Sequence, residues 1–440
     1  MEASRILRIG LAGCGTVGSG VVRLLSQQRQ AITRRTGVDI QLARILVRNP
    51  DRDRGPEVPP QILSTKAADL LAPEIDVVVE LLGGCDTARE VVLSAIRAGK
   101  HVVTANKALI AQHGAVVFAE AAHRNVSVAI EATCGGGVPV VGAIQRGLVA
   151  NRIDALYGIV NGTCNFVLSE MLDTRKSYAD ALADAQRLGY AEADPALDVS
   201  GADSAHKLAV LAALAFASPI DLRRVRAEGI ERIELADLIA GYEQGYVCKL
   251  LAIAERHGKS LALEVLPAFL DRSHPLAAVR GVFNGISLYG HAVGHTHYYG
   301  RGAGAGPTAS AVLADIVDVA VGTAPRLPYP IPATGATAEG TSYQPLDELE
   351  ARYYIRFQVQ DRPGVLAEIA RVFAEQRISL SALTQRDPHD ETGRQIVPLV
   401  VTTHRARVGD IRAALGRMER IEAVARPPVA IRIVDTPEEA

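Results

Sequence analysis

A glycine pattern near the N-terminus constrains the fold of this chain more than any other feature. The stretch "GLAGCGTVGSG" places Gly13, Gly15 and Gly18 directly after an apolar run and directly before a helical pattern. At this spacing the first glycine permits a tight turn, the second lets the backbone approach a pyrophosphate, and the third lets the helix pack closely on the strand. The helix N-terminus also favours a bound anion. The motif therefore predicts a dinucleotide-binding unit rather than a merely structural turn.

The first ~130 residues repeat this strand–helix alternation. Short apolar runs such as "ILRIGLAG", "DIQLARILV", "IDVVVELLG", "KHVVTA" and "VSVAIEA" are separated by stretches with helical periodicity, including residues 17–35 and "DTAREVVLSAIRAG". Strands that alternate with helices favour a parallel sheet covered by helices on both faces. We expect an α/β domain with a Rossmann-type doubly wound sheet over residues 1–132.

The rest of the chain divides into segments of different character. Residues 133–326 alternate glycine-rich turns with alanine-rich helical stretches, which predicts an α+β domain for substrate binding and dimerisation. Residues 327–350 are rich in Pro, Gly and Thr and are predicted to be a linker. Residues 351–435 show the order βαββαβ of a ferredoxin-like domain. The charge run "RRVRAEGIERIELADL" at residues 223–238 is interpreted as a solvated helix face.

Composition excludes several classes of protein. A chain of 440 residues is expected to form roughly two or three domains. A net charge of -2 gives no basic excess of the kind that nucleic-acid binding requires, and no apolar run reaches the length of a membrane span. The five cysteines are scattered and include no CxxC pair, which is typical of a reduced, cytoplasmic protein. We therefore expect no nucleic-acid partner and no membrane partner.

Two basic residues follow predicted strands at the edge of the sheet where a dinucleotide would bind. NAD-selective sites carry Asp or Glu at the end of the second strand, whereas this strand ends in Arg48, whose guanidinium suits a 2′-phosphate. A solvated loop arginine explains Arg48 equally well, and Asp51 and Asp53 keep NAD(H) open beside NADP(H). Lys107 follows another strand at the sheet edge where ligands bind, although a lone lysine is usually a surface residue.

The stretch "GYAEADPALDVSGADSAHK" collects acids ahead of one lysine. Asp203 and Lys207 are spaced i, i+4 and so share a helix face. An exposed pair of this kind would contribute only about 0.3–0.5 kcal/mol. The helix that follows is almost wholly apolar, however, and is expected to be buried. A lysine tuned by burial or by neighbouring charge can carry the proton that accompanies hydride transfer, and surplus carboxylate suits a substrate with an ammonium group.

Together these motifs resemble the homoserine dehydrogenase family. The resemblance covers residues 1 to about 325 through "GLAGCGTVGSGVV", "GKHVVTANKALIAQHG", "NGTCNF", "GYAEADPALDVSGADSAHKLAVLAALAF" and "GAGAGPTASAVLADI". The C-terminal "DRPGVLAEIA" resembles an ACT domain, an amino-acid-sensing module. The resemblance implies NAD(P)H-dependent interconversion of L-aspartate 4-semialdehyde and L-homoserine in threonine, methionine and isoleucine biosynthesis. It also implies a threonine effector and a homodimer or homotetramer.

The resemblance also implies roles for individual residues. Lys207 would donate the proton, Asp203 would orient it, and Asp203 and Glu192 would bind homoserine in a pocket that Asp198 also lines. Lys107 would touch both substrate and cofactor. Further cofactor contacts would come from Thr16, Val17, Gly189 and Gly304. A monovalent cation, Na⁺, would be held through oxygens, several of them backbone carbonyls, of Glu131, Cys134, Gly136 and Val138.

The sequence departs from the family pattern at two residues, and two alternative functions remain open. Cys164 and Phe166 stand where the family commonly has Thr and Tyr, which leaves the detail of the substrate pocket open. A dehydrogenase for another amino-acid-derived aldehyde would share these motifs. A nonenzymatic amino-acid sensor would not need the intact pair of Asp203 and Lys207.

Overall fold

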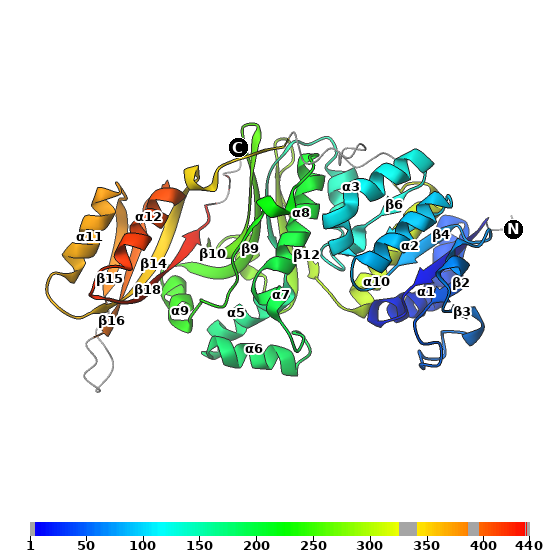
Figure 1. Ribbon diagram of the computed structural model, residues 1–440, viewed down its shortest axis with the longest axis horizontal. Coiled ribbons are helices and arrows are strands. Elements are labelled where there is room, and N and C mark those ends of the chain that lie inside the picture. Colours follow the sequence, from blue (N-terminus) through cyan, green and yellow to red (C-terminus); the bar gives the residue numbers. More distant parts are fainter. Residues whose placement is uncertain (1–4, 325–340, 386–395, 436, 438–440) are drawn as a thin grey trace. The chain divides into compact units, whose positions relative to one another are not determined.

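The computed structural model describes residues 5–324, 341–385, 396–435 and 437 (Figure 1). The chain divides into two compact units, each built from several segments. The first comprises Met1–Gly162, Asp203–Val225 and Val282–Thr341, and the second Thr163–Ala202, Arg226–Gly281 and Ser342–Ala440.

The first unit contains the predicted Rossmann-type sheet, which is parallel throughout and has the strand order β3-β2-β1-β4-β5-β6. Its strands are β1 (Arg5–Ala12), β2 (Val38–Leu46), β3 (Leu63–Ser64), β4 (Val77–Glu80), β5 (His101–Thr104) and β6 (Val128–Ala129). The connecting helices are α1 (Thr16–Thr36), α2 (Asp86–Arg97) and α3 (Lys107–Arg124). The doubly wound prediction is confirmed. The last strand is shorter than "VSVAIEA", because a 3₁₀ turn at Glu131–Thr133 follows it.

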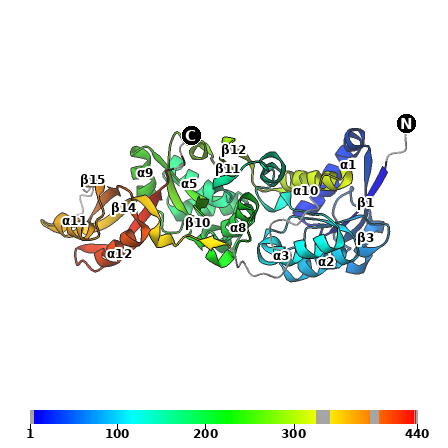
Figure 2. The same cartoon turned by 90° about the horizontal axis from the view of Figure 1, so that it is seen from above.

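A helix from far along the chain completes this layer. Helix α10 (Ala305–Val321) packs against α1, with α1 and α10 on one face of the sheet and α2 and α3 on the other (Figure 2). The contact is close, because a Cβ added at Gly20 would lie 2.7 Å from the carbonyl oxygen of Ala305. Leu313 and Ile316 of α10 belong to the same buried core as Leu11 of β1. The sequence placed residues 305–321 only within the range of the α+β domain.

The first unit also holds a three-stranded antiparallel sheet and the helix that carries the predicted lysine. The strands are β7 (Ile153–Ile159), β11 (Phe283–Gly290) and β12 (Gly294–Arg301), in the order β12-β11-β7. Helix α8 (Ala202–Phe216) is buried along nearly its whole length, as its apolar sequence predicts. A short turn of helix, α4 (Val140–Gly142), follows the glycine-rich stretch near residue 135.

The second unit is built around the long antiparallel pair β9 (Tyr246–His257) and β10 (Ser260–Asp271). Short strands β8 (Arg226–Ala227) and β13 (Ser342–Tyr343) pair with β10 in parallel. The helices of this unit that precede the pair in sequence are α5 (Gly162–Thr174), α6 (Tyr178–Arg187), α7 (Ala196–Val199) and α9 (Leu235–Glu243). The predicted linker falls partly outside the described residues, and its described end forms β13 and a 3₁₀ turn at Leu346–Glu348.

The C-terminal module has the predicted βαββαβ order. It comprises β14 (Glu350–Gln360), α11 (Val365–Glu375), β15 (Leu380–Gln385), β16 (Ile396–Thr403), α12 (Val408–Met418) and β18 (Val424–Ile433), with the short β17 (Ala406–Arg407) before α12. Its strand order is β18-β14-β16-β15, and both helices share a core with alternate residues of β14 such as Ile355 and Phe357. The end of strand β18 also pairs in parallel with β10, where Arg432 lies opposite Ala268.

The charge run at residues 223–238 is not the solvated helix face that was predicted. Helix begins only at Leu235, and Arg226 lies on β8. Asp237 is fully buried, and its two carboxylate oxygens accept hydrogen bonds from the guanidinium group of Arg356 at 2.6 and 3.1 Å. Arg356 lies on β14, more than a hundred residues away, so the local pattern of the sequence could not predict this pair.

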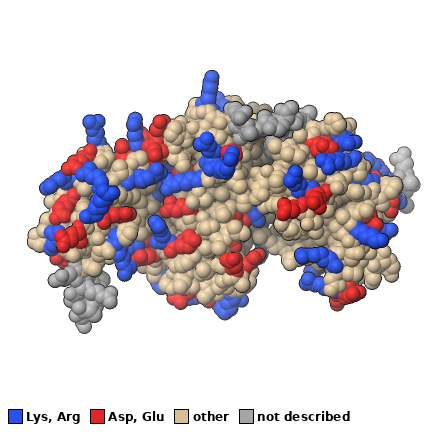
Figure 3. All heavy atoms as spheres, in the orientation of Figure 1, with Lys and Arg blue, Asp and Glu red and all other residues tan. Residues whose placement is uncertain are grey.

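The surface carries charges of both signs. On the face drawn in Figure 3, Lys and Arg side chains are interspersed with Asp and Glu side chains. Within the described residues, no helix combines the length and the apolar character that crossing a membrane would require.

Candidate active site

The glycine loop between β1 and α1 has the geometry that the motif requires. Gly13 has φ +97° and sits so close to the next strand that an added Cβ would lie 2.7 Å from the carbonyl oxygen of Leu81. A Cβ at Gly18 would lie 2.3 Å from the carbonyl oxygen of Gly13, so the helix needs glycine to pack there. Beside Gly15 there is open space. The loop therefore leaves room for a phosphate group at Gly15 alone.

The start of α1 is suited to an anion. Gly15 is its N-cap and provides no side-chain acceptor, so the first amide groups, at Thr16 and Val17, can meet a ligand. Arg48 lies exposed just after β2, and Asp51 and Asp53 are also exposed in the loop that follows. The residues present therefore fit a nicotinamide dinucleotide.

Lys107 is positioned by a hydrogen-bonded turn at the end of β5. Asn106 caps α3 by accepting a hydrogen bond from the amide of Leu109 at 3.0 Å, and its side-chain amide donates to the carbonyl oxygen of Gly84 at 2.8 Å. Capping of this kind fixes the first turn of a helix. The lysine is the first residue of that turn.

A buried carboxylate below the turn holds it in place. Glu80 is fully buried at the end of β4 and accepts hydrogen bonds from the hydroxyl of Thr104 at 2.6 Å and the amide of Leu82 at 2.7 Å. The same hydroxyl accepts a hydrogen bond from the amide of Asn106 at 3.0 Å. Burial raises the pKa of Glu80. Sequence reasoning missed this residue, although a Glu ending a run of valines was a visible signal.

Asp203 and two lysines form a compact charged cluster. The Asp203 carboxylate lies 2.8 Å from Nζ of Lys207 and 2.9 Å from Nζ of Lys107, and it accepts a hydrogen bond from Nδ2 of Asn161 at 3.1 Å. The side chains of Asp203 and Lys207 are only 11% and 13% exposed, against 37% for Lys107. The pair is therefore not the exposed helix salt bridge that its spacing alone allows.

The electrostatics of the cluster keep Asp203 ionised. Burial by itself would raise the pKa of Asp203, but the ammonium groups of Lys207 and Lys107 outweigh burial and hold that pKa well below its ordinary value. Nζ of Lys207 also donates to the carbonyl oxygen of Val160 at 2.6 Å. Two acceptors thus fix the Lys207 ammonium group in one orientation. Such a group can deliver a proton to an oxygen placed beside it.

The other predicted substrate residues belong to the second unit. Oδ2 of Asp198 lies 3.3 Å from the hydroxyl of Thr163, and its carbonyl oxygen accepts a hydrogen bond from the thiol of Cys164 at 3.2 Å. Glu192 is exposed, and Gly189 has φ +75° at the end of α6. Asp194, in the same acidic stretch, has a local structural role. Its Oδ1 accepts a hydrogen bond from the amide of Ala196 at the start of α7.

Gly304 and the predicted cation turn lie in the first unit. Gly304 is the N-cap of α10 with φ +117°. Gly135 and Gly136 both have positive φ, and a Cβ at Gly136 would lie 2.3 Å from the carbonyl oxygen of Gly302. The carboxylate of Glu131 accepts hydrogen bonds from the amides of Val141 at 3.0 Å and Gly142 at 2.7 Å. The turn is therefore ordered by its own backbone contacts.

The chemistry of this turn limits how it could hold a cation. Cys134 is fully buried, and burial raises the pKa of its thiol to about 12. In the part of the chain that the structure describes, no group of three or more His, Cys, Asp or Glu could hold a metal ion. Backbone carbonyl oxygens, such as that of Val138, are the donors that fit a hard monovalent cation.

The glycine loop, the parallel sheet and the buried lysine–carboxylate cluster define a nicotinamide-dependent oxidoreductase. The chain matches the family model described as "Homoserine dehydrogenase, NAD binding domain" over residues 13–131, the model "Homoserine dehydrogenase" over residues 139–317 and the model "ACT domain" over residues 353–422. The chain belongs to the homoserine dehydrogenase family and carries a C-terminal ACT domain.

Relatives and solved structures agree with these matches. The chain is 42% identical to a homoserine dehydrogenase of Pseudomonas aeruginosa, over 97% of this chain and 98% of that protein. It is 36% identical to a homoserine dehydrogenase of Bacillus subtilis, over 96% of each chain. The crystal structure of a homoserine dehydrogenase from Thiobacillus denitrificans superposes with a TM-score of 0.90 at 42% identity, covering 98% of this chain and 99% of that chain.

Proposed function

We propose that this chain catalyses the reversible, NAD(P)H-dependent reduction of L-aspartate 4-semialdehyde to L-homoserine. The observation that carries the proposal is the cluster of buried Lys207 and Asp203 with the more exposed Lys107, in a chain of this family. The nicotinamide, when bound, supplies a hydride to the aldehyde carbon. The residues of the chain then have to bind the amino-acid substrate and to supply one proton to its oxygen.

Lys207 acts as the proton donor in the direction of reduction. Its ammonium group gives a proton to the carbonyl oxygen while the carbon gains the hydride, and in the reverse direction its amine takes the hydroxyl proton. Asp203 stays ionised throughout and holds the ammonium group in place. Lys107 provides a second positive charge beside the same carboxylate, where it can contact substrate and cofactor.

The acids of the stretch before α8 bind the substrate ammonium group. Glu192 and Asp198 supply carboxylates for this purpose, together with Asp203. Every compound with an α-ammonium and an aldehyde or alcohol at the right distance would meet these groups. A dehydrogenase acting on another amino-acid-derived aldehyde is therefore the alternative to be tested.

The cofactor is NADP(H) or NAD(H), bound by Gly13, Gly15, Thr16, Val17 and Gly18. Arg48 lies free to approach a 2′-phosphate, which favours NADP(H), whereas exposed Asp51 keeps NAD(H) possible. We also assign Gly189 and Gly304 to cofactor contacts. A monovalent cation, Na⁺, at the turn of Glu131, Cys134, Gly136 and Val138 would have a structural role, through backbone carbonyls.

We further propose that the ACT domain binds threonine. A pocket of about 360 Å³ lies at the "DRPG" turn, where Gly364 has φ +96° and α11 starts, so amide groups can meet an amino-acid carboxylate. We expect a homodimer or homotetramer in the cytoplasm. Deleting residues after Gln344 is a poor test of this role, because it would leave Asp237 buried without Arg356. Asp361→Ala at the turn is the better change.

Steady-state assays test both proposals. Turnover is expected with aspartate semialdehyde and with homoserine, using NADH and NADPH in parallel, and threonine should inhibit the wild type more than Asp361→Ala. Reduction of NAD(P)⁺ by a related amino alcohol but not by homoserine would overturn the substrate assignment. Equal response of wild type and variant to threonine would overturn the effector site.

A further inference from the structure

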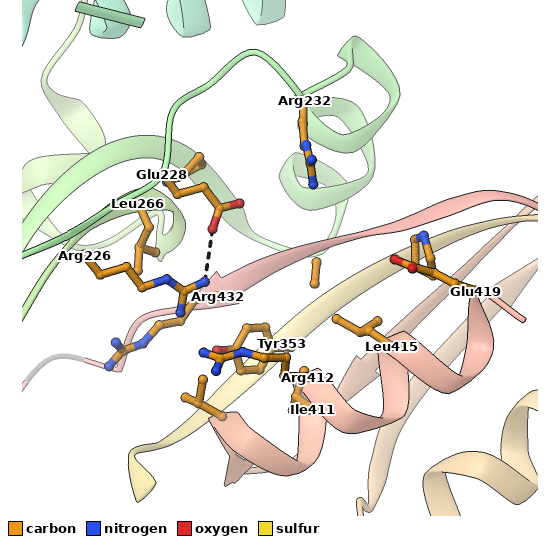
Figure 4. A pocket seen from close by; sticks show the side chains of 15 residues that line it. Arg226, Glu228, Arg232, Leu266, Tyr353, Ile411, Arg412, Leu415, Glu419 and Arg432 are labelled. Atoms are coloured by element: carbon orange, nitrogen blue, oxygen red, sulfur yellow. Dashed lines mark hydrogen bonds and ion pairs between the residues drawn. The ribbon is translucent and has the colours of Figure 1, made fainter. Parts of the chain in front are cut away.

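A second pocket in the second unit is lined by none of the predicted active-site residues and by no residue of the "DRPG" turn (Figure 4). It encloses about 320 Å³ between two walls. One wall comes from the segment around β8 and from β10, and the other from β14, α12 and β18 of the ACT domain. The pocket thus occupies the junction of the ACT domain with the sheet to which β18 is attached.

Arginines dominate the polar lining. Arg226 and Arg232 stand on the first wall and Arg412 and Arg432 on the second, and the acidic lining residues are Glu228 and Glu419. Arg226 and Arg232 belong to the charge run at residues 223–238, which was predicted to be a solvated helix face. The ACT wall and the sheet wall therefore both present guanidinium groups to one cavity.

Two of the arginines form a fixed floor. Arg432 lies 2.6 Å from the buried carboxylate of Glu264, and Arg226 lies 3.7 Å from the same group. Burial raises the pKa of Glu264, while the two guanidinium groups oppose that rise. Arg432 is also 3.6 Å from Glu255. Glu264 and Glu255 do not line the pocket; they hold the floor in place and balance its two formal positive charges. Arg226 also lies 3.4 Å from Glu228.

The other two arginines are available to a ligand. Arg412 pairs with Asp347 at 2.6 Å, but both side chains are more than half exposed, and such pairs contribute little. Arg232 is exposed and has no ion-pair partner among the residues that the structure describes. Figure 4 shows it extending from its loop toward the ACT wall. Arg232 and Arg412 can therefore both bind an anion while losing few existing contacts.

We propose that this pocket is a second effector site, which takes a small organic anion carrying carboxylate or phosphate groups. Guanidinium groups on opposite walls match an anion with two acidic groups, because each group can receive paired N–H donors. Leu266, Ile411 and Leu415 add an apolar strip beside them, suited to a short hydrocarbon part. A ligand held this way ties the ACT domain to β8 and β10. In sequence, β8 begins ten residues after the end of α8, the helix of Asp203 and Lys207.

Calorimetric titration of the full chain tests the proposal, with pyrophosphate and succinate as probes at constant ionic strength. Saturating NADP⁺ is present, so that pyrophosphate cannot bind at the glycine loop. The pocket variant is Arg232→Gln/Arg412→Gln. The matched control is Arg371→Gln/Arg420→Gln, which removes the same charge from exposed positions outside the pocket.

At least one probe should bind, and the pocket variant should bind it about tenfold more weakly or worse, because charge-assisted hydrogen bonds are lost. The control variant should bind it as the wild type does. Preference for pyrophosphate or for succinate distinguishes a phosphate from a carboxylate ligand. Failure of both probes to bind at up to about 10 mM, or equal affinity of the wild type and the pocket variant, would overturn the proposal. Equal weakening in the control would do the same, since it would indicate charge alone.

Discussion

Replacing Asp203 by Asn removes one charge from the centre of the proposed site while keeping the shape of the side chain. The carboxylate has two ammonium partners, at 2.8 and 2.9 Å, and one amide partner at 3.1 Å. An Asn can accept from only one of its two terminal atoms. The variant therefore leaves Lys207 buried without its counter-charge and takes a charged partner from Lys107.

The expected magnitude follows from burial. Neutralising one partner of a buried ion pair costs about 3–5 kcal/mol, whereas exposed pairs contribute about 0–1 kcal/mol. Lys107 is 37% exposed, so water screens its share, and we expect the free energy of unfolding to fall by about 3 kcal/mol. Loss of orientation at Lys207 should lower kcat for homoserine oxidation by about a hundredfold, within the range that a positioned acid–base group contributes.

The pH dependence of this difference has a definite sign. The pKa of Asp203 is held below the ordinary value of 3.8. The stability that it contributes is therefore complete above that value and is lost as the pH falls toward the lower pKa of the folded state. Urea unfolding of wild type and variant from about pH 7 down to about pH 3 should show a constant difference near neutral pH that begins to shrink below about pH 4.

Glu120→Gln serves as the matched control. Glu120 also forms an i, i+4 pair, with Arg124 on α3, but the partner is 46% exposed. This change should lower the free energy of unfolding by about 0.5 kcal/mol or less and leave kcat unchanged. The reasoning would be refuted if Asp203→Asn kept wild-type kcat, or if it were no less stable than Glu120→Gln at neutral pH.

Three further changes test other parts of the structure. Glu80→Gln should lower kcat several-fold, measured at saturating substrate, because the buried turn before α3 loses a charged acceptor worth about 1.5–3 kcal/mol; unchanged kcat would argue against a positioning role. Gly15→Ala should weaken dinucleotide binding in a fluorescence titration without lowering Tm, whereas Gly18→Ala should lower Tm, because only the latter Cβ meets backbone; the reverse pattern would contradict the assignment of the loop. Arg356→Met should destabilise the fold by about 3–5 kcal/mol in urea unfolding, and adding Asp237→Leu should recover much of that loss; no recovery would show that the pair is not the cause.

Much of the fold could be predicted from local pattern. The Rossmann-type sheet follows from β-branched runs separated by helical periodicity, and the ACT domain follows from its element order, because these signals depend on neighbours in sequence. Asp203 and Lys207 could be paired because one helical turn separates them. Their burial could be expected from the apolar helix that follows.

Contacts between distant segments could not be predicted in the same way. The meeting of Lys107 with Asp203 joins the start of α3 to α8, almost a hundred residues later. The packing of α10 on α1 and the pairing of Asp237 with Arg356 have the same character. The charged residues at positions 223–238 predicted an exposed helix. Nothing nearby in sequence indicates that Asp237 is buried against Arg356.

The most direct test of proton transfer by Lys207 is a single-turnover measurement on Lys207→Ala. Enzyme mixed with excess aspartate semialdehyde and a limiting amount of bound NADPH reports hydride transfer through the loss of nicotinamide absorbance. If Lys207 supplies the proton, the variant should bind NADPH as the wild type does and transfer hydride slower by about 10²–10⁴-fold. A wild-type rate of transfer in a folded variant would contradict the assignment of the lysine.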